Sequence, residues 1–405
     1  MKTMKLALLG GAALAVSAIG AQAEDLTALK AEIEALNARV QQLEAAPAAP
    51  AGYSLLTSSV QQRTMVPGNE DGEVKGIGDA AHVIGVLPTA DAAPSTTIEW
   101  SGYVYAIVAH TDYGYYGGNA DTNVIGRAHL RVVGKTDTAV GEVGVRVQLR
   151  SQFAGVDGDR QFFGHEYWGW WAMTPELTLG GGYSGSLGNI GYGLDGACNC
   201  WWTDWFSSEI RGNQTGDSAL NALNPGDTTQ VRLSYSSGPL SFAIALEEGD
   251  IGSAFGDGDL AVAGEIKYSG DSFSGEISAI AYGSEDQPNG GHNTGTGWQI
   301  GAGIGFGLGD MANISLAAGY GDNTWTDYYS FSGLINFNLS DAVHAEVGAA
   351  WGRETFFDHE MLSVLAGVYY SPVSQLTIGL EGQWTDADVF AEDFTTFDVV
   401  TIYSF

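Results

Sequence analysis

The sequence has little positive charge, almost no cysteine and no long apolar run after its first residues. It holds 16 lysine and arginine residues against 48 aspartate and glutamate residues, so its formal net charge is −32 over 405 residues. This acidity argues against nucleic acid as a partner. Without a later apolar stretch of about 20 residues, the sequence offers no transmembrane helix.

The two cysteines, Cys198 and Cys200, lie one residue apart. In an exported chain they either form a strained local disulfide or bridge nothing, and the pair offers too few ligands for a metal site. The 7 histidines are scattered, and no nucleophile–base pair or phosphate-binding loop can be assembled. The sequence therefore predicts no catalytic residues, no metal and no cofactor.

The first residues have the pattern of a signal peptide, residues 1–23. Lys2 and Lys5 precede an apolar run at 6–19, and Ala21–Ala23 is a small-x-small cleavage site. The apolar run is too short to span a membrane as a helix. Loss of the two lysines takes the exported chain from −32 to −34 (−32 − 2).

Residues 24–44 carry apolar side chains at alternating spacings of three and four. This pattern predicts a short coiled coil, and it consists of Leu26, Leu29, Ile33, Leu36, Val40 and Leu43. An amphipathic helix packed on its own domain is the alternative, and the Pro/Ala-rich segment that follows favours a helix held apart. We interpret 45–96 as this spacer and an irregular periplasmic connector, because 53–96 shows no sustained period.

From residue 97 onward, alternating stretches of about ten residues are separated by turn residues, which is typical of a transmembrane β-barrel. Short turns alternate with long polar loops, a sorting for which a soluble β-sandwich has no reason. The sequence therefore predicts an all-β fold, an antiparallel barrel of about sixteen strands over 97–405. We place its strands near 97–110, 123–134, 141–153, 163–173, 176–187, 228–237, 240–248, 259–269, 273–283, 297–308, 311–321, 328–339, 343–353, 360–371, 375–385 and 393–405.

The last predicted strand alternates to the final residue, with aromatic side chains at Tyr403 and Phe405. A closed barrel must pair its last strand with its first, so a terminal aromatic residue at the membrane rim anchors that closure. We predict that Tyr403 and Phe405 form an assembly signal. Aromatic clusters at Tyr167, Trp168, Trp170 and Trp171, at Tyr369 and Tyr370, and at Trp384 are predicted at the membrane interfaces.

The few basic residues of the exported chain concentrate on one face of two predicted strands. Apolar neighbours occupy the other face, and charge facing lipid costs ~2–4 kcal/mol near the midplane, so the basic face must be the lumen. The predicted pore residues are Arg127, His129, Arg131, Arg146, Arg150, Arg232 and Lys267. Structural ion pairs within the lumen are an equally weighted interpretation.

The connection near 188–227 is far longer than any other and follows the fifth predicted strand. Its aromatic residues can pack against a wall and its acids can face an opening. The residues singled out are Asp195, Cys198, Cys200, Trp201, Trp202, Asp204, Trp205 and Glu209.

Signal peptide, heptad coil, spacer, barrel and terminal phenylalanine together resemble the trimeric porins of Gram-negative bacteria that carry an N-terminal periplasmic coiled coil. The resemblance implies that 188–227 folds inward as a constriction loop, although the loop lacks the Pro-Glu-Phe-Gly motif of enterobacterial porins. It implies an outer-membrane homotrimer, in contact with lipid, lipopolysaccharide and the barrel assembly machinery, through which small hydrophilic solutes and ions diffuse passively.

Two other functions remain open from the sequence. An outer-membrane lipase or protease needs a Ser/His or Asp/His set, which this chain does not supply. A structural anchor would use the coil to tether the cell wall, with peptidoglycan as its partner, and would tolerate a closed barrel. If the chain is a porin, its arginines favour small organic anions despite the acidic total.

Overall fold

The computed structural model describes residues 55–62, 80–87, 96–113, 120–151, 162–194, 227–248, 260–270, 272–284, 295–309, 311–322, 327–355, 358–388 and 393–405. The signal peptide 1–23, the coiled coil 24–44 and most of the loop 188–227 lie outside these residues. So do the loop residues Asp195, Cys198, Cys200, Trp201, Trp202, Asp204, Trp205 and Glu209. No helix in the described part of the chain is long and apolar enough to cross a membrane.

The described residues form 18 strands in one sheet. Their bounds are β1 Leu55–Gln62, β2 Ala80–Leu87, β3 Thr96–Tyr113, β4 Asp121–Thr138, β5 Gly141–Ser151, β6 Phe162–Ala172, β7 Leu177–Gly185, β8 Asp227–Ser237, β9 Leu240–Glu248, β10 Leu260–Ser269, β11 Phe273–Ser284, β12 Gly295–Gly307, β13 Ala312–Asp322, β14 Asp327–Ser340, β15 Val343–Glu354, β16 His359–Val373, β17 Leu376–Ala387 and β18 Phe394–Ser404.

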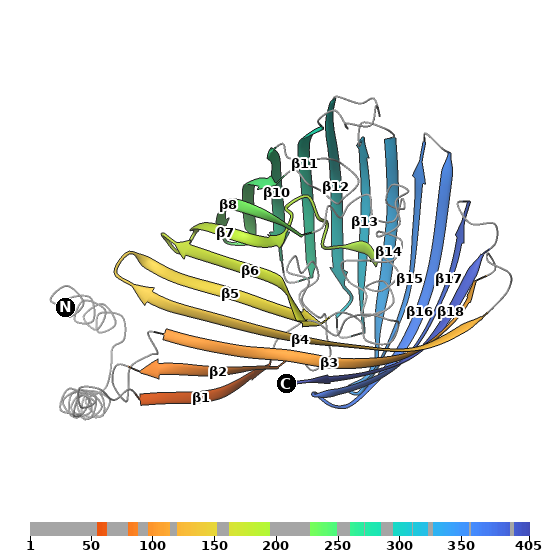
Figure 1. Ribbon diagram of the computed structural model, residues 1–405, viewed down its shortest axis with the longest axis horizontal. Coiled ribbons are helices and arrows are strands. Elements are labelled where there is room, and N and C mark those ends of the chain that lie inside the picture. The colour runs from red at the N-terminus through yellow and green to blue at the C-terminus, as the bar shows by residue number, and fades with distance from the viewer. Residues whose placement is uncertain are drawn as a thin grey trace, which may run out of the picture. The chain divides into compact units, whose positions relative to one another are not determined.

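Strands β3 to β18 form a closed antiparallel barrel of 16 strands. Each strand pairs with the next along the chain, as Figure 1 shows, and β18 returns to pair with β3. That closing register runs from Phe394 opposite Tyr113 to Ser404 opposite Tyr103. The predicted fold class is confirmed, and each of the sixteen predicted strands corresponds to one of β3 to β18 with boundaries shifted by a few residues.

The segment 45–96 differs from its interpretation as an irregular connector throughout. It contains two strands, β1 and β2, which pair with each other. The sequence of β1, LLTSSVQQ, has no clean period-two alternation. Hydrogen bonding between backbones therefore defines these strands where the side-chain pattern does not.

The two faces of the barrel have opposite chemistry. On β5, Val143, Val145 and Val147 are exposed on the outer face, whereas Gln148, directly after Val147, is fully buried on the inner face. Val104, Ile300 and other large apolar residues continue the exposed outer surface round the barrel. Apolar side chains point outward and polar ones inward, the reverse of a soluble domain.

Short turns join the strands at one end of the barrel. They follow the even-numbered strands and occupy 139–140, 173–176, 238–239, 270–272, 308–311, 341–342 and 374–375. The turn between β8 and β9 contains Gly238 at φ +59°, a conformation that glycine adopts without strain. Longer connections follow β3, β5, β7, β9 and β11, so the sequence's sorting of short turns and long loops is present.

Candidate functional site

Basic side chains gather on the inner face of β4 and β5. Arg127 and His129 are buried there, and His129 makes an edge-on ring contact with Tyr103 at 5.0 Å between centroids. The strand register places His129 opposite Arg150. Because neighbouring strands lie ~4.8 Å apart, the two strands bring these groups into one patch. We call this patch the basic wall, and it comprises Arg127, His129, Arg131, Arg146 and Arg150.

One carboxylate, Glu166 on β6, is built into this wall. It forms an ion pair with Arg146 and accepts a hydrogen bond from Gln148. Ser184 Oγ donates a third hydrogen bond to Glu166 Oε1 at 2.8 Å. The charge of Arg146 is therefore largely balanced locally, while the sequence alone gave no sign of this partner.

After β7 the chain turns inward and crosses the inner wall. Residues 186–194, which we call the crossing segment, hydrogen-bond to side chains of five strands, β9, β11, β12, β13 and β14. These contacts lie 60 to 138 residues away along the chain. The start of the predicted constriction loop thus lies along the inner face of the barrel.

Carboxylates and hydroxyls on the wall satisfy the backbone of the crossing segment. Glu247 accepts bonds from Ser186 Oγ at 2.6 Å and from the Leu187 amide at 2.9 Å. Further contacts join the Gly188 carbonyl to Gln299, the Asn189 carbonyl to Ser278, and the amides of Gly191, Gly193 and Leu194 to Glu276, Ser315 and Ser332. Buried polar backbone must be paired, so these side chains fix the segment's path.

Small inward-facing residues make room for the apolar side chains of the crossing segment. Leu187 is 1 % exposed and packs among small residues that include Ala261 and Ala263. A Cβ on Gly303 would lie 2.5 Å from the side chain of Tyr192, so only glycine fits beneath that ring. Alanine and glycine residues on the inner face therefore leave the space in which the segment packs.

Arg232 on β8 and Lys267 on β10 are not part of the basic wall. Arg232 donates to the Gly185 carbonyl at 2.7 Å, directly before the crossing segment, and its guanidinium lies 5.2 Å from the centre of the Trp168 ring. Lys267 Nζ is 3.0 Å from Glu265 and 3.8 Å from Glu276. Lys267 thus contacts Glu276, which also holds the Gly191 amide, and Arg232 holds the residue before the segment.

Acidic side chains also occur on the inner face of β15, β17 and β18. Glu346 on β15, Glu381 on β17 and Asp398 on β18 are buried on the inner face. Glu381 lies opposite Asp398 in the register and accepts a hydrogen bond from Tyr369 at 2.7 Å. The sequence placed the acids of the pore on the long loop, but within the described residues the buried acids belong to the wall.

No family model matches the chain, and no curated protein matches it in sequence. Solved structures do match. The outer membrane channel DcaP of Acinetobacter baumannii is 13 % identical, with 77 % of this chain and 98 % of that chain covered and a TM-score of 0.59. The anion-selective porin of Comamonas acidovorans is 11 % identical, with 76 % and 100 % covered and a TM-score of 0.57.

A third similar structure is OmpT, an outer membrane protein of Vibrio cholerae, at 11 % identity, 78 % and 99 % coverage and a TM-score of 0.53. The chain has the fold of the outer-membrane porins. The low identities limit this likeness to the fold, so the residues of the pore are argued from this chain alone.

The porin fold divides the predicted aromatic clusters between its two faces. Tyr167 and Trp171 are exposed on the outer face, as predicted. Trp168 and Trp170 alternate with them and face inward, where their rings lie against Gly180 and Gly144. The assignment of this whole cluster to the membrane interface is wrong for these two residues, because period-two alternation separates them from their neighbours.

The second aromatic pair divides in the same way. Tyr370 is 49 % exposed on the outer face, whereas Tyr369 is 0 % exposed on the inner face. His344 stacks on the Tyr369 ring with centroids 4.7 Å apart. Tyr369 is therefore part of the inner wall and not of an interfacial belt.

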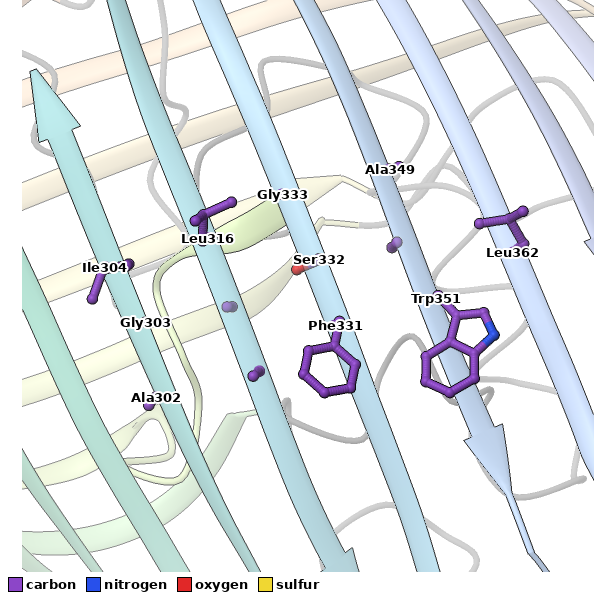
Figure 2. Close-up of a pocket in the computed structure, with 13 residues that line it drawn as sticks. Ala302, Gly303, Ile304, Leu316, Phe331, Ser332, Gly333, Ala349, Trp351 and Leu362 are labelled. Atoms are coloured by element: carbon purple, nitrogen blue, oxygen red, sulfur yellow. The ribbon is translucent and has the colours of Figure 1, made fainter. Parts of the chain in front are cut away.

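A hollow of about 520 Å³ lies between strands β12 and β16. Figure 2 shows its larger side chains, Ile304, Leu316, Phe331, Trp351 and Leu362. Leu316, Phe331 and Leu362 belong to the exposed outer surface. The lining includes no charged residue. The hollow is therefore not a candidate site for a charged or hydrophilic solute.

The chain end completes the barrel as the alternation predicts. The amide of Phe405 donates to the Gly102 carbonyl at 3.0 Å, and the Gly102 amide donates back at 3.3 Å. A Cβ on Gly102 would lie 2.9 Å from the Phe405 ring, so the ring packs directly on this glycine. Tyr403, two residues earlier, pairs with Val104.

Replacing Phe405 with alanine is expected to reduce the amount of barrel inserted in cells by severalfold while leaving the melting temperature of detergent-refolded protein within a few degrees. The backbone bonds to Gly102 survive the substitution, and only one partly exposed ring is lost. Heat-modifiability gels of membranes and of refolded protein measure the two quantities. Equal membrane levels for the variant and the parent would refute an assembly role.

Within the described residues, no group of three or more histidine, cysteine, aspartate or glutamate side chains is placed to hold a metal ion. His165 contacts Asp227 at 3.4 Å, and its ring lies 6.1 Å from that of His129. His129 and His165 are therefore polar side chains that line the inner face together with the arginines of the basic wall.

Proposed function

We propose that the chain is an outer-membrane porin through which small hydrophilic solutes and ions diffuse passively. The observation that carries this proposal is a closed barrel with an apolar outer face, a charged inner face and a segment laid across that inner face. A segment docked against the wall narrows a lumen without closing it. A barrel that served only as an anchor would have no use for buried charges along an internal passage.

The outer face supports placement in a membrane. Its exposed apolar side chains, including Val104, Ile300 and Leu380, recur on alternate residues of strands around the barrel. Charge facing lipid would cost ~2–4 kcal/mol at the midplane, and the arginines of β4 and β5 face the other way. We place the barrel in the outer membrane and the N-terminal coil on its periplasmic side, with the short turns.

The basic wall supports a preference for small organic anions. Arg127 and Arg131 flank His129 on β4, and Arg150 on β5 lies opposite His129. Guanidinium groups bind carboxylates with two parallel hydrogen bonds. Glu166 balances the charge of Arg146. Charges at the exposed rim are screened by salt over a Debye length of ~8–10 Å.

Purified protein added to a planar bilayer in KCl is expected to give stepwise ion conductance. If three barrels insert together, each insertion event contains three equal sub-steps. Protein heated in detergent to unfold the barrel is the control and should give no steps. Native barrels that insert into liposomes and conduct no ions would refute the porin and favour the structural anchor.

A further inference from the structure

Two indole rings lie on the inner wall of the barrel. Trp168 and Trp170 follow one another on the inner face of β6 and are partly exposed. A Cβ built on Gly180 would lie 2.2 Å from Trp168, and one on Gly144 would lie 2.0 Å from Trp170. Each ring therefore leans across a neighbouring strand and lies along the wall, with glycine beneath it.

Polar contacts hold the two rings in these positions. Trp170 Nε1 donates to Glu142 Oε1 at 3.0 Å. The Arg232 guanidinium lies 5.2 Å from the centre of the Trp168 ring, a cation–π contact. Arg232 is itself fixed by bonds to Gly185 and Gln230, so the ring and the cation form one rigid unit.

Two guanidinium groups lie on the strands next to the rings. Arg146 is directly opposite Trp168 in the register of β5 and β6, and Arg232 is opposite Gly180 on the other side. The patch thus combines aromatic rings with guanidinium groups, one of them 5.2 Å from the Trp168 ring centre. An aromatic ring can pack against indole, and a carboxylate attached to it can approach a guanidinium.

We propose that Trp168 and Trp170 form a binding platform for solutes that combine a planar aromatic ring with a carboxylate. This inference rests on the proposed channel function and names a class of solute within it. Trp170 lies two residues nearer the short-turn end than Trp168, a step of ~6.8 Å along the strand. A solute that passes the basic wall therefore meets the two rings in succession.

The test compares benzoate with cyclohexanecarboxylate, which has the same number of carbons and the same charge but no aromatic ring. Each acid is added to single channels in planar bilayers, and the mean duration of current blockages is measured. Benzoate is expected to stay about threefold to tenfold longer in the parent channel. In the double variant Trp168→Leu and Trp170→Leu the two residence times should become equal.

Trp171→Leu is the matched control, because this tryptophan belongs to the same strand but is exposed on the outer face. It should keep the parent's ratio, and Trp168→Phe, which retains a ring, should keep part of it. Equal residence of the two acids in the parent, or a ratio that survives the double variant, would overturn the platform. A parent that conducts no KCl would instead overturn the proposed function.

Discussion

Replacing Arg127 and Arg131 with serine is expected to shift the reversal potential in a salt gradient toward cation preference and to slow the flux of small dicarboxylates. Both side chains belong to the inner face of β4, and Arg127 is 7 % exposed. A unit charge ~7 Å from a passing anion is worth ~0.6 kcal/mol in bulk water and ~2.4 kcal/mol at an effective dielectric of ~20. Two charges thus change the anion-to-cation permeability ratio by about tenfold or more.

Arg353→Ser is the matched control for this pair. Arg353 lies on the outer face of β15 near the long-loop end, where it is bonded to Asp358 at 3.0 Å. Its loss removes one arginine from the chain without touching the inner wall. If the Arg127 and Arg131 double variant keeps the parent's reversal potential and dicarboxylate flux, these arginines are structural ion-pair partners and the pore is a simple sieve.

Replacing Glu247 with alanine is expected to raise single-channel conductance and to make the open current noisier. Glu247 is 0 % exposed and accepts two hydrogen bonds from the start of the crossing segment. Its removal leaves the buried amide of Leu187 without its acceptor, a cost of ~1–3 kcal/mol. The segment then has less to hold it against the wall, so its position fluctuates within the passage.

Glu248→Ala supplies the comparison, because this glutamate is the next residue of β9 and its side chain is exposed on the opposite face. Glu247→Gln retains an oxygen acceptor and should fall between the parent and Glu247→Ala. Single-channel recordings at fixed voltage give conductance and current variance together. Parent-like values of both in Glu247→Ala would mean that the segment does not set the width of the passage.

Period-two alternation is the reason that the barrel could be predicted from the sequence. In a strand that faces lipid on one side and polar groups on the other, each residue reports its face, as Val143, Val145 and Val147 do against Arg146 and Gln148. Sixteen such strands predicted the fold, and closure of the barrel required the last strand to pair with the first, as β18 does with β3. Strands without this alternation, such as β1, were missed.

The partners within the inner wall could not be predicted, because they depend on register between strands. Glu166 and Glu247 lie in strands of alternating pattern, and their neighbours in the sequence do not indicate that they bind Arg146 and Leu187. Trp168 and Trp170 were misplaced for a related reason. The prediction for their cluster rested on its aromatic composition. Both residues lie an even number of positions from the buried Glu166, which puts them on the inner face.

The crossing segment also dictates an order of events in time. Leu187 binds a residue 60 positions later in the chain, whereas Leu194 binds Ser332, 138 positions later. Contacts between distant residues form slowly, because a long loop must first close. We therefore expect the segment to settle at Leu187 before it settles at Leu194, because the strand that holds Leu194 comes later in the chain. The far end of the segment can dock only once β14 has joined the sheet, so the passage reaches its final width late in folding.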